Sequence, residues 1–154
     1  MLNYPKCYRL SSGTASDAYQ MVSFDSALID AGISNYNLLR VSSILPIGCI
    51  QNDHIDVKEG SALLVAYGTI SSNVPGQRIA SAVGVGIPED ESMVGVIMEY
   101  ADVGTAEIAE DAVRNMVSRA MKNHDIPCKD ILVSSAETIV TDDYATVVSA
   151  VALW

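Results

Sequence analysis

The chain of 154 residues has few basic side chains, two histidines and three cysteines, and each shortage narrows the possible functions. Nine Lys and Arg against nineteen Asp and Glu leave a formal net charge of −10. This argues against a nucleic-acid partner, because a phosphate backbone is normally met by a basic surface. Cys7, Cys49 and Cys128 are widely separated, which fits a reducing compartment better than a disulfide framework. The histidines lack zinc-site spacing, so we expect no metal.

The chain also lacks a long apolar run. No stretch approaches the roughly 20 residues that a membrane helix requires, and the first residues lack the basic-then-apolar pattern of a signal peptide. We therefore expect a cytoplasmic protein without a membrane partner. With 49% hydrophobic and only 18% charged residues, the chain carries more apolar material than a small surface hides easily, so self-association is expected.

The pattern of apolar and turn residues predicts a single domain, 1–154, with two helices and several strands. Residues 25–32 are expected to form a short helix, with Asp25 or Ser23 as its cap and Gly32 at its end. A longer helix should follow Thr105, because apolar residues then recur every three or four positions up to residue 123. Strands are expected at 38–46, 61–72, 78–87, 92–100, 130–140 and 144–153.

Strands and helices do not alternate regularly, which argues against a doubly wound fold. The runs 61–72 and 78–87 flank the turn at 73–76 and are predicted to form a hairpin. Short turns between successive strands favour antiparallel pairing, so the expected class is α+β with two stacked, largely antiparallel β-sheets. The run Gly84-Val85-Gly86 lacks the third glycine of a nucleotide-binding loop and is interpreted as a place of close backbone packing.

Ser42 and Ser43 are an unusual pair for the expected strand 38–46, since strands favour β-branched and aromatic residues. A buried hydroxyl without a partner costs roughly 1–3 kcal/mol. An ordinary explanation is that both serines lie at a strand end and bond to the backbone. A chemical explanation is self-cleavage. The Ser43 hydroxyl attacks the Ser42 carbonyl, and elimination with loss of ammonia then leaves a pyruvoyl group on residue 43.

The whole chain resembles the pyruvoyl-dependent arginine decarboxylases, and the likeness lies in short segments whose order and spacing match the family. These segments are 23–33, 37–46, 66–68, 74–76, 95–100 and 150–154. The resemblance implies two stacked sheets flanked by helices (an αββα sandwich), assembled as a homotrimer with active sites between subunits. It also implies self-cleavage into residues 1–42 (the β chain) and 43–154 (the α chain). The implied reaction converts L-arginine to agmatine and carbon dioxide through a Schiff base with the pyruvoyl group, without pyridoxal phosphate or metal.

The resemblance gives roles to individual residues. Ser43 is the nucleophile of cleavage and then the pyruvoyl group, while Asn37 assists the cleavage. On an ideal strand, however, Asn37 and Ser42 point to opposite faces. Glu99 follows an apolar run, where burial should favour its protonated form, and it protonates the substrate carbanion. Asp25 pairs with the guanidinium group of the substrate, which suits a carboxylate partner.

Other functions stay open at this point. The chain could be a pyruvoyl-dependent decarboxylase of another amino acid, or an unprocessed relative that serves as a structural or ligand-binding trimer. A serine hydrolase using Ser42 or Ser43 is disfavoured, because neither histidine lies in a recognisable triad context. Lys58, Lys122 and Lys129 are lysines that could hold pyridoxal in a different type of decarboxylase, although solvated surface is their simpler interpretation.

Overall fold

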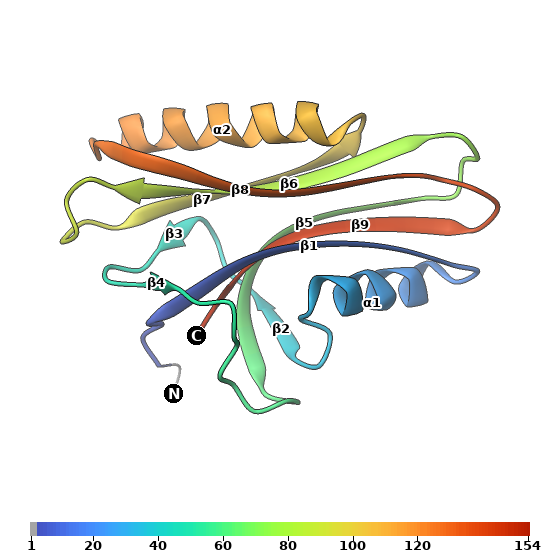
Figure 1. Cartoon of the computed structure of the whole chain (residues 1–154), viewed down its shortest axis with the longest axis horizontal. Helices are drawn as coiled ribbons and strands as arrows, with labels where there is room; N and C mark the ends of the chain where they lie inside the picture. The colour runs from blue at the N-terminus through green and yellow to red at the C-terminus, as the bar shows by residue number, and fades with distance from the viewer. Residues whose placement is uncertain (1–2) are drawn as a thin grey trace.

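The computed structural model describes residues 3–154, and their strands form two sheets, ordered β2-β5-β9-β1-β4 and β3-β7-β6-β8. In Figure 1 the sheets are stacked face to face, with α2 on the outer face of the four-stranded sheet and α1 on the outer face of the five-stranded sheet. The predicted α+β class and the sandwich of two sheets flanked by helices are confirmed. In chain order the elements are β1 (Cys7–Asp17), α1 (Gln20–Ala31), β2 (Asn37–Arg40), β3 (Ile44–Leu45), β4 (Ile50–Gln51), β5 (Ala62–Ser72), β6 (Arg78–Pro88), β7 (Gly95–Val103), α2 (Ala106–Asn123), β8 (Cys128–Ile139) and β9 (Tyr144–Leu153).

Most strand pairs are antiparallel, as predicted, but the two edge strands β2 and β4 pair in parallel with β5 and β1. The predicted hairpin of 61–72 with 78–87 is wrong. The strands β5 and β6 do occur there, but β5 pairs with β2 and β9 while β6 pairs with β7 and β8. The chain therefore passes from one sheet to the other at the turn, and β5 and β6 lie in opposite layers of the sandwich.

Helix α2 forms as predicted, since the Thr105 hydroxyl accepts a hydrogen bond from the Ile108 amide at 3.3 Å and caps its first turn. The helix packs closely on β6. A Cβ atom at Gly86 would lie 2.7 Å from a methyl carbon of Val117, and one at Gly84 would lie 3.1 Å from the other. The predicted close packing at these two glycines is confirmed. Neither of the two helices in residues 3–154 is long and apolar enough to cross a bilayer.

Helix α1 ends as predicted at Gly32, whose φ of +76° is a left-handed conformation that suits glycine. Its predicted start is wrong, because the helix begins at Gln20. The Asp17 carboxylate accepts the Tyr19 amide at 3.0 Å and turns the chain into the helix five residues earlier than expected. Asp25 therefore lies within the helix and does not cap it. The second cap candidate, Ser23, donates to the carbonyl of Gln20 inside the first turn.

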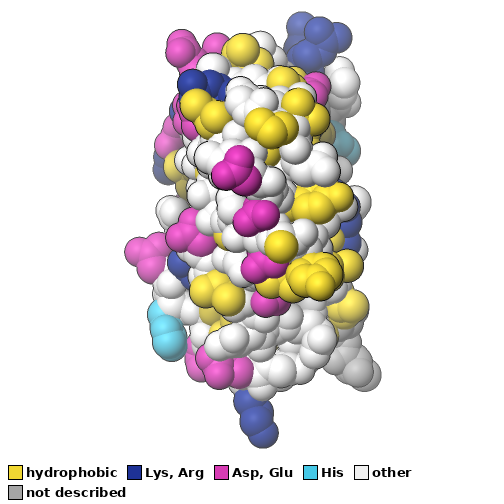
Figure 2. All heavy atoms as spheres, turned by 90° about the vertical axis from the view of Figure 1, so that its right-hand side faces the viewer, with side chains coloured by type: hydrophobic (Ala, Val, Ile, Leu, Met, Phe, Trp, Pro, Cys, Tyr) yellow, Lys and Arg dark blue, Asp and Glu magenta, His cyan; other side chains and the backbone are white. Residues whose placement is uncertain are grey.

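Exposed apolar side chains remain on several elements. On α1 and at its start they include Tyr19, Met21 and Ile29, and at the opposite sheet's edge they include Ile44. Figure 2 views the end of the sandwich at the right of Figure 1, where apolar side chains are interspersed with many acidic ones and few basic ones. This face is thus acidic with interspersed apolar side chains, which agrees with the composition.

Candidate active site

The serine pair lies where the chain crosses from one sheet to the other, between β2 and β3. On one side of the pair, the Val41 amide donates to the Val65 carbonyl at 3.1 Å and closes the pairing of β2 with β5. On the other side, the Ile97 amide donates to the Ser43 carbonyl at 2.7 Å and opens the pairing of β3 with β7. Ser42 and Ser43 therefore sit in a short joint anchored at both ends.

The prediction of a buried strand over 38–46 is wrong at its centre. Strand pairing stops at Arg40 and resumes at Ile44, and between them Ser42 is exposed while Ser43 is partly buried. Within residues 3–154, the Ser42 carbonyl accepts no hydrogen bond. A carbonyl group in an irregular, accessible joint can be approached by a neighbouring hydroxyl, whereas one in a strand ladder is engaged by its partner strand.

Glu99 lies in the middle of β7, opposite Val83 on β6, with its Cβ directed at β5 of the other sheet. Gly68 makes room for it, because a Cβ atom at this position would lie only 3.2 Å from the Cβ of Glu99. The side chain is 31% exposed. Burial raises the pKa of the Glu99 carboxyl, and the nearby charge of Arg40 opposes this rise. The predicted direction of the pKa shift is thus confirmed.

Arg40 connects Glu99 to the aromatic ring of Tyr67. Its guanidinium carbon lies 4.4 Å from the ring centroid of Tyr67, and its Nη2 donates to the Tyr67 carbonyl at 2.6 Å. The same nitrogen lies 4.0 Å from Oε1 of Glu99. Sequence reasoning missed both Arg40 and Tyr67, although they stand in two of the segments that carried the resemblance. Their side chains meet because β2 and β5 pair in parallel, a long-range pairing that a local pattern does not reveal.

Within one chain, the structure does not bring Asn37 and Asp25 to Ser43. Asn37 is exposed at the opposite end of β2, where its Nδ2 donates to the Gly60 carbonyl at 2.8 Å. Asp25 is exposed on α1 and, within residues 3–154, forms no ion pair. Its neighbour Phe24 packs on Tyr67 with ring centroids 6.2 Å apart, so α1 reaches the surroundings of Arg40.

A sequence profile described as pyruvoyl-dependent arginine decarboxylase matches residues 7–154. The chain belongs to this family. It is 35% identical over 152 residues to the pyruvoyl-dependent arginine decarboxylase of Methanococcus aeolicus, which covers 97% of this chain and 90% of the relative. It is 36% identical to that of Pyrococcus abyssi, over 97% of this chain and 96% of the relative.

Among solved structures, the fold resembles a pyruvoyl-dependent histidine decarboxylase with a TM-score of 0.53 and 15% identity. The likeness covers 64% of this chain and 52% of that chain, and it concerns the fold. In this chain Ser42 and Ser43 occupy the joint between the two sheets, and Glu99 lies on β7, the strand with which β3 pairs.

Proposed function

We propose that the protein is a self-processing decarboxylase that converts L-arginine to agmatine and carbon dioxide. The observation that carries this proposal is the family match over residues 7–154, which includes the Ser42–Ser43 joint and Glu99. The named activity of the relatives supplies the substrate. The accessible Ser42–Ser43 joint suits self-cleavage, and the partly buried Glu99 carboxyl suits proton donation.

Residues at the joint fit the formation of a pyruvoyl group. The Ser43 hydroxyl attacks the Ser42 carbonyl, which is free of protein hydrogen bonds within the described residues. The peptide bond breaks as the acyl group moves from the Ser43 nitrogen to its side-chain oxygen and forms an ester. Elimination from this ester releases residues 1–42 as a carboxylate. Water then replaces the nitrogen of residue 43, which leaves as ammonia, and the larger fragment is 43–154. The hydrogen bond from the Ile97 amide keeps the Ser43 carbonyl on β7, so the new end of the larger fragment stays in place after cleavage.

A pyruvoyl group at residue 43 would supply the electron sink that decarboxylation of an amino acid requires. The Ile97 N–H donates to the carbonyl oxygen of residue 43 at 2.7 Å, and such a fixed donor stabilises negative charge developing on that oxygen. Glu99 carries the proton for the substrate carbon, because burial favours its protonated form at a higher pH than usual. No exogenous cofactor enters this assignment.

The remaining two assigned residues require a second subunit. Asp25 and Asn37 are exposed in their own chain, and exposed apolar side chains lie near both, Met21 and Ile29 beside Asp25 and Leu39 beside Asn37. Met21 and Ile29 lie one helical turn before and after Asp25 on α1, and Ile44 follows the serine joint. In the homotrimer, α1 of one subunit faces the joint of its neighbour, where Asp25 pairs with the guanidinium group of arginine.

The test measures carbon dioxide and agmatine released from L-arginine by the purified protein, beside Ser43→Ala. We expect release by the wild type and none by the uncleaved variant. Asp25→Asn should cleave normally yet bind arginine more weakly, by roughly 2–5 kcal/mol if the pair is buried in the trimer. Unchanged arginine affinity in a folded, cleaved Asp25→Asn enzyme would favour another amino acid as substrate. A wild type that stays uncleaved and inactive would favour a structural or ligand-binding trimer.

A further inference from the structure

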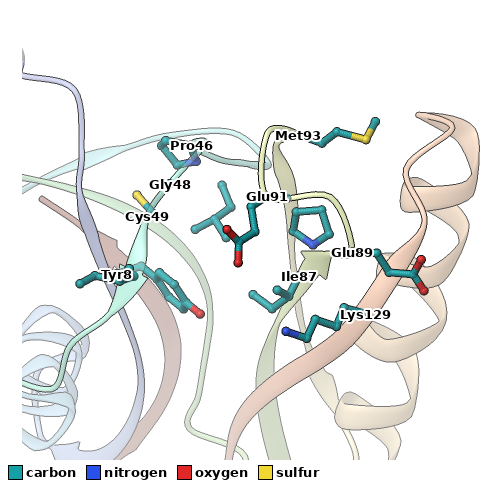
Figure 3. A pocket seen from close by; sticks show the side chains of 13 residues that line it. Tyr8, Pro46, Gly48, Cys49, Ile87, Glu89, Glu91, Met93 and Lys129 are labelled. Atoms are coloured by element: carbon teal, nitrogen blue, oxygen red, sulfur yellow. The ribbon is translucent and has the colours of Figure 1, made fainter.

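A separate cavity of about 280 Å³ opens between the two sheets at the end where β1, β3 and β8 approach one another (Figure 3). Neither Ser43 nor Glu99 lines it. Its size is close to the lower end, about 300 Å³, of typical small-molecule sites. Its apolar wall comes from Leu45, Ile50 and Ile87, on strands β3, β4 and β6.

Tyr8 on β1 is the most deeply placed polar side chain of this cavity. It is 5% exposed, and within residues 3–154 its hydroxyl has no hydrogen-bond partner. Figure 3 shows the hydroxyl pointing into the cavity. Burial raises the pKa of Tyr8, with smaller contributions from Cys49 and Asp130, so the hydroxyl keeps its proton and is available as a donor. Within residues 3–154 no fully buried side-chain nitrogen or oxygen lacks a partner, so the Tyr8 hydroxyl is open to the cavity, where a bound acceptor can take the place of water.

Two charged groups of opposite sign point toward the same space from the rim. Figure 3 shows the Glu91 carboxylate and the Lys129 ammonium directed inward near the Tyr8 hydroxyl, whereas Glu89 points away from them. Within the described residues, the ion pairs are formed by two other arginine and glutamate pairs, so Glu91 and Lys129 are both unpaired. The cavity therefore offers one anion, one cation and one neutral donor around an apolar wall.

We propose that this cavity binds an aliphatic α-amino acid in its zwitterionic form. The ligand carboxylate accepts hydrogen bonds from Tyr8 and Lys129, and its ammonium donates to Glu91. Its aliphatic side chain packs on Leu45 and Ile87, where it removes apolar surface from water. The ligand would contact β3 two residues after Ser43, on a part of the strand that the proposed decarboxylation site does not use.

The experiment is calorimetric titration of the purified full-length protein with L-leucine, together with methyl NMR spectra of labelled Leu45 and Ile87. Two further probes each keep one half of the zwitterion: 4-methylpentanoate has the carboxylate, and isoamylamine has the ammonium. Tyr8→Phe and Lys129→Gln remove the proposed donors. Tyr19→Phe and Lys122→Gln are matched controls, because both residues are exposed and lie outside the cavity.

We expect L-leucine to bind, to shift both methyl signals, and to bind more tightly than either half. Tyr8→Phe and Lys129→Gln should each weaken binding by about 3–10-fold, as loss of one hydrogen bond typically does, while the controls leave it unchanged. Absence of heat and of methyl shifts at the highest soluble leucine concentration would overturn the proposal. So would equal binding of 4-methylpentanoate, or binding that survives both cavity substitutions. Because binding and methyl shifts do not depend on turnover, these results stand whether or not the protein decarboxylates arginine.

Discussion

Residues 3–154 contain two arginine–glutamate pairs whose glutamates are similarly exposed but have pKa values shifted in opposite directions. The side chains of Glu99 and Glu137 are almost equally exposed, at 31% and 33%. Glu137 accepts a hydrogen bond from Arg78 and another from the Ala106 amide, and these bonds lower its pKa. Burial raises the pKa of Glu99, and Arg40, 4.0 Å away, counters this only in part.

The comparison separates a pair with a structural role from a pair whose carboxyl suits the proposed chemistry. Direct hydrogen bonds favour the ionised form of Glu137. Its carboxylate accepts the Ala106 amide and so stabilises the first turn of α2. Arg40 instead donates its hydrogen bond to the Tyr67 carbonyl. Its positive charge therefore lies near the Glu99 carboxyl, at 4.0 Å, without donating a hydrogen bond to it. A carboxyl group in that situation can hold a proton and release it to a substrate.

Removing each carboxylate gives the largest expected contrast. Glu99→Gln should still cleave at the serine joint but lose decarboxylation by ~10²-fold or more, the usual cost of losing a general acid. Glu137→Gln, the matched control, should keep near-normal turnover. The measurement is kcat with arginine for the cleaved forms of both variants. Near-normal turnover of cleaved Glu99→Gln would remove Glu99 from its role.

Filling the space beneath Glu99 should have the next largest effect. In Gly68→Ala the new methyl group would lie 3.2 Å from the Cβ of Glu99, so this side chain must shift by a few tenths of an ångström. Misplaced catalytic groups lose up to ~10²-fold in rate for about 1 Å, so we expect a drop of roughly 10-fold in kcat. Kinetics and a thermal melt together check this. An unchanged kcat in a normally stable variant would show that the position of Glu99 is not critical.

Replacing Arg40 should shift the pH profile of kcat, whereas replacing Arg78 should not. In Arg40→Met the charge that lowers the pKa of Glu99 is lost, so the pKa rises further and the acid form persists to higher pH. The alkaline fall of kcat should therefore move to higher pH. Arg78→Met should leave that limb in place. The same displacement in both variants, or in neither, would contradict the assignment of Arg40 and Glu99 as a working pair.

The smallest expected contrast is in stability against pH. A raised pKa in the folded protein means that ionised Glu99 destabilises the fold above its usual titration range, and this penalty disappears in acid. Glu99→Gln should thus gain melting temperature over wild type as pH rises from acid to neutral. Glu137 has a lowered pKa, so its contribution is present at neutral pH and is lost as pH falls through the folded pKa. Glu137→Gln should lose melting temperature at neutral pH only. Parallel trends would contradict the opposite shifts.

The sequence predicts those parts of the fold that depend on local signals. Thr105 and Gly32 mark helix ends, because the first caps with its hydroxyl and the second adopts a left-handed conformation. The apolar runs at β5, β6 and β9 favour strands whichever neighbours they pair with. It does not predict β1, whose residues are mostly small and hydroxylated. Ser12 on β1 forms hydrogen bonds with Ser149 on β9 of the same sheet and with Ser134 on β8 of the other sheet, so this strand is held partly by polar side-chain contacts.

For the site, the resemblance predicts Ser43 and Glu99, but the geometry around them depends on long-range pairing. The run 38–46 is apolar enough for one strand, and only the change of sheet between β2 and β3 breaks it at the serines. Likewise Arg40 and Tyr67 are 27 positions apart and meet through sheet pairing. The structure of one chain leaves Asp25 and Asn37 away from Ser43, and their proposed roles rest on the proposed trimer.

Denaturing mass spectrometry of the purified, active enzyme tests the central claim most directly. Cleavage between Ser42 and Ser43 predicts two fragments, residues 1–42 and 43–154, with the larger one lighter by one ammonia than simple hydrolysis would give. Ser43→Ala should show the intact chain. An intact, unmodified wild-type chain in fully active enzyme would contradict the proposed origin of the reactive group at Ser43.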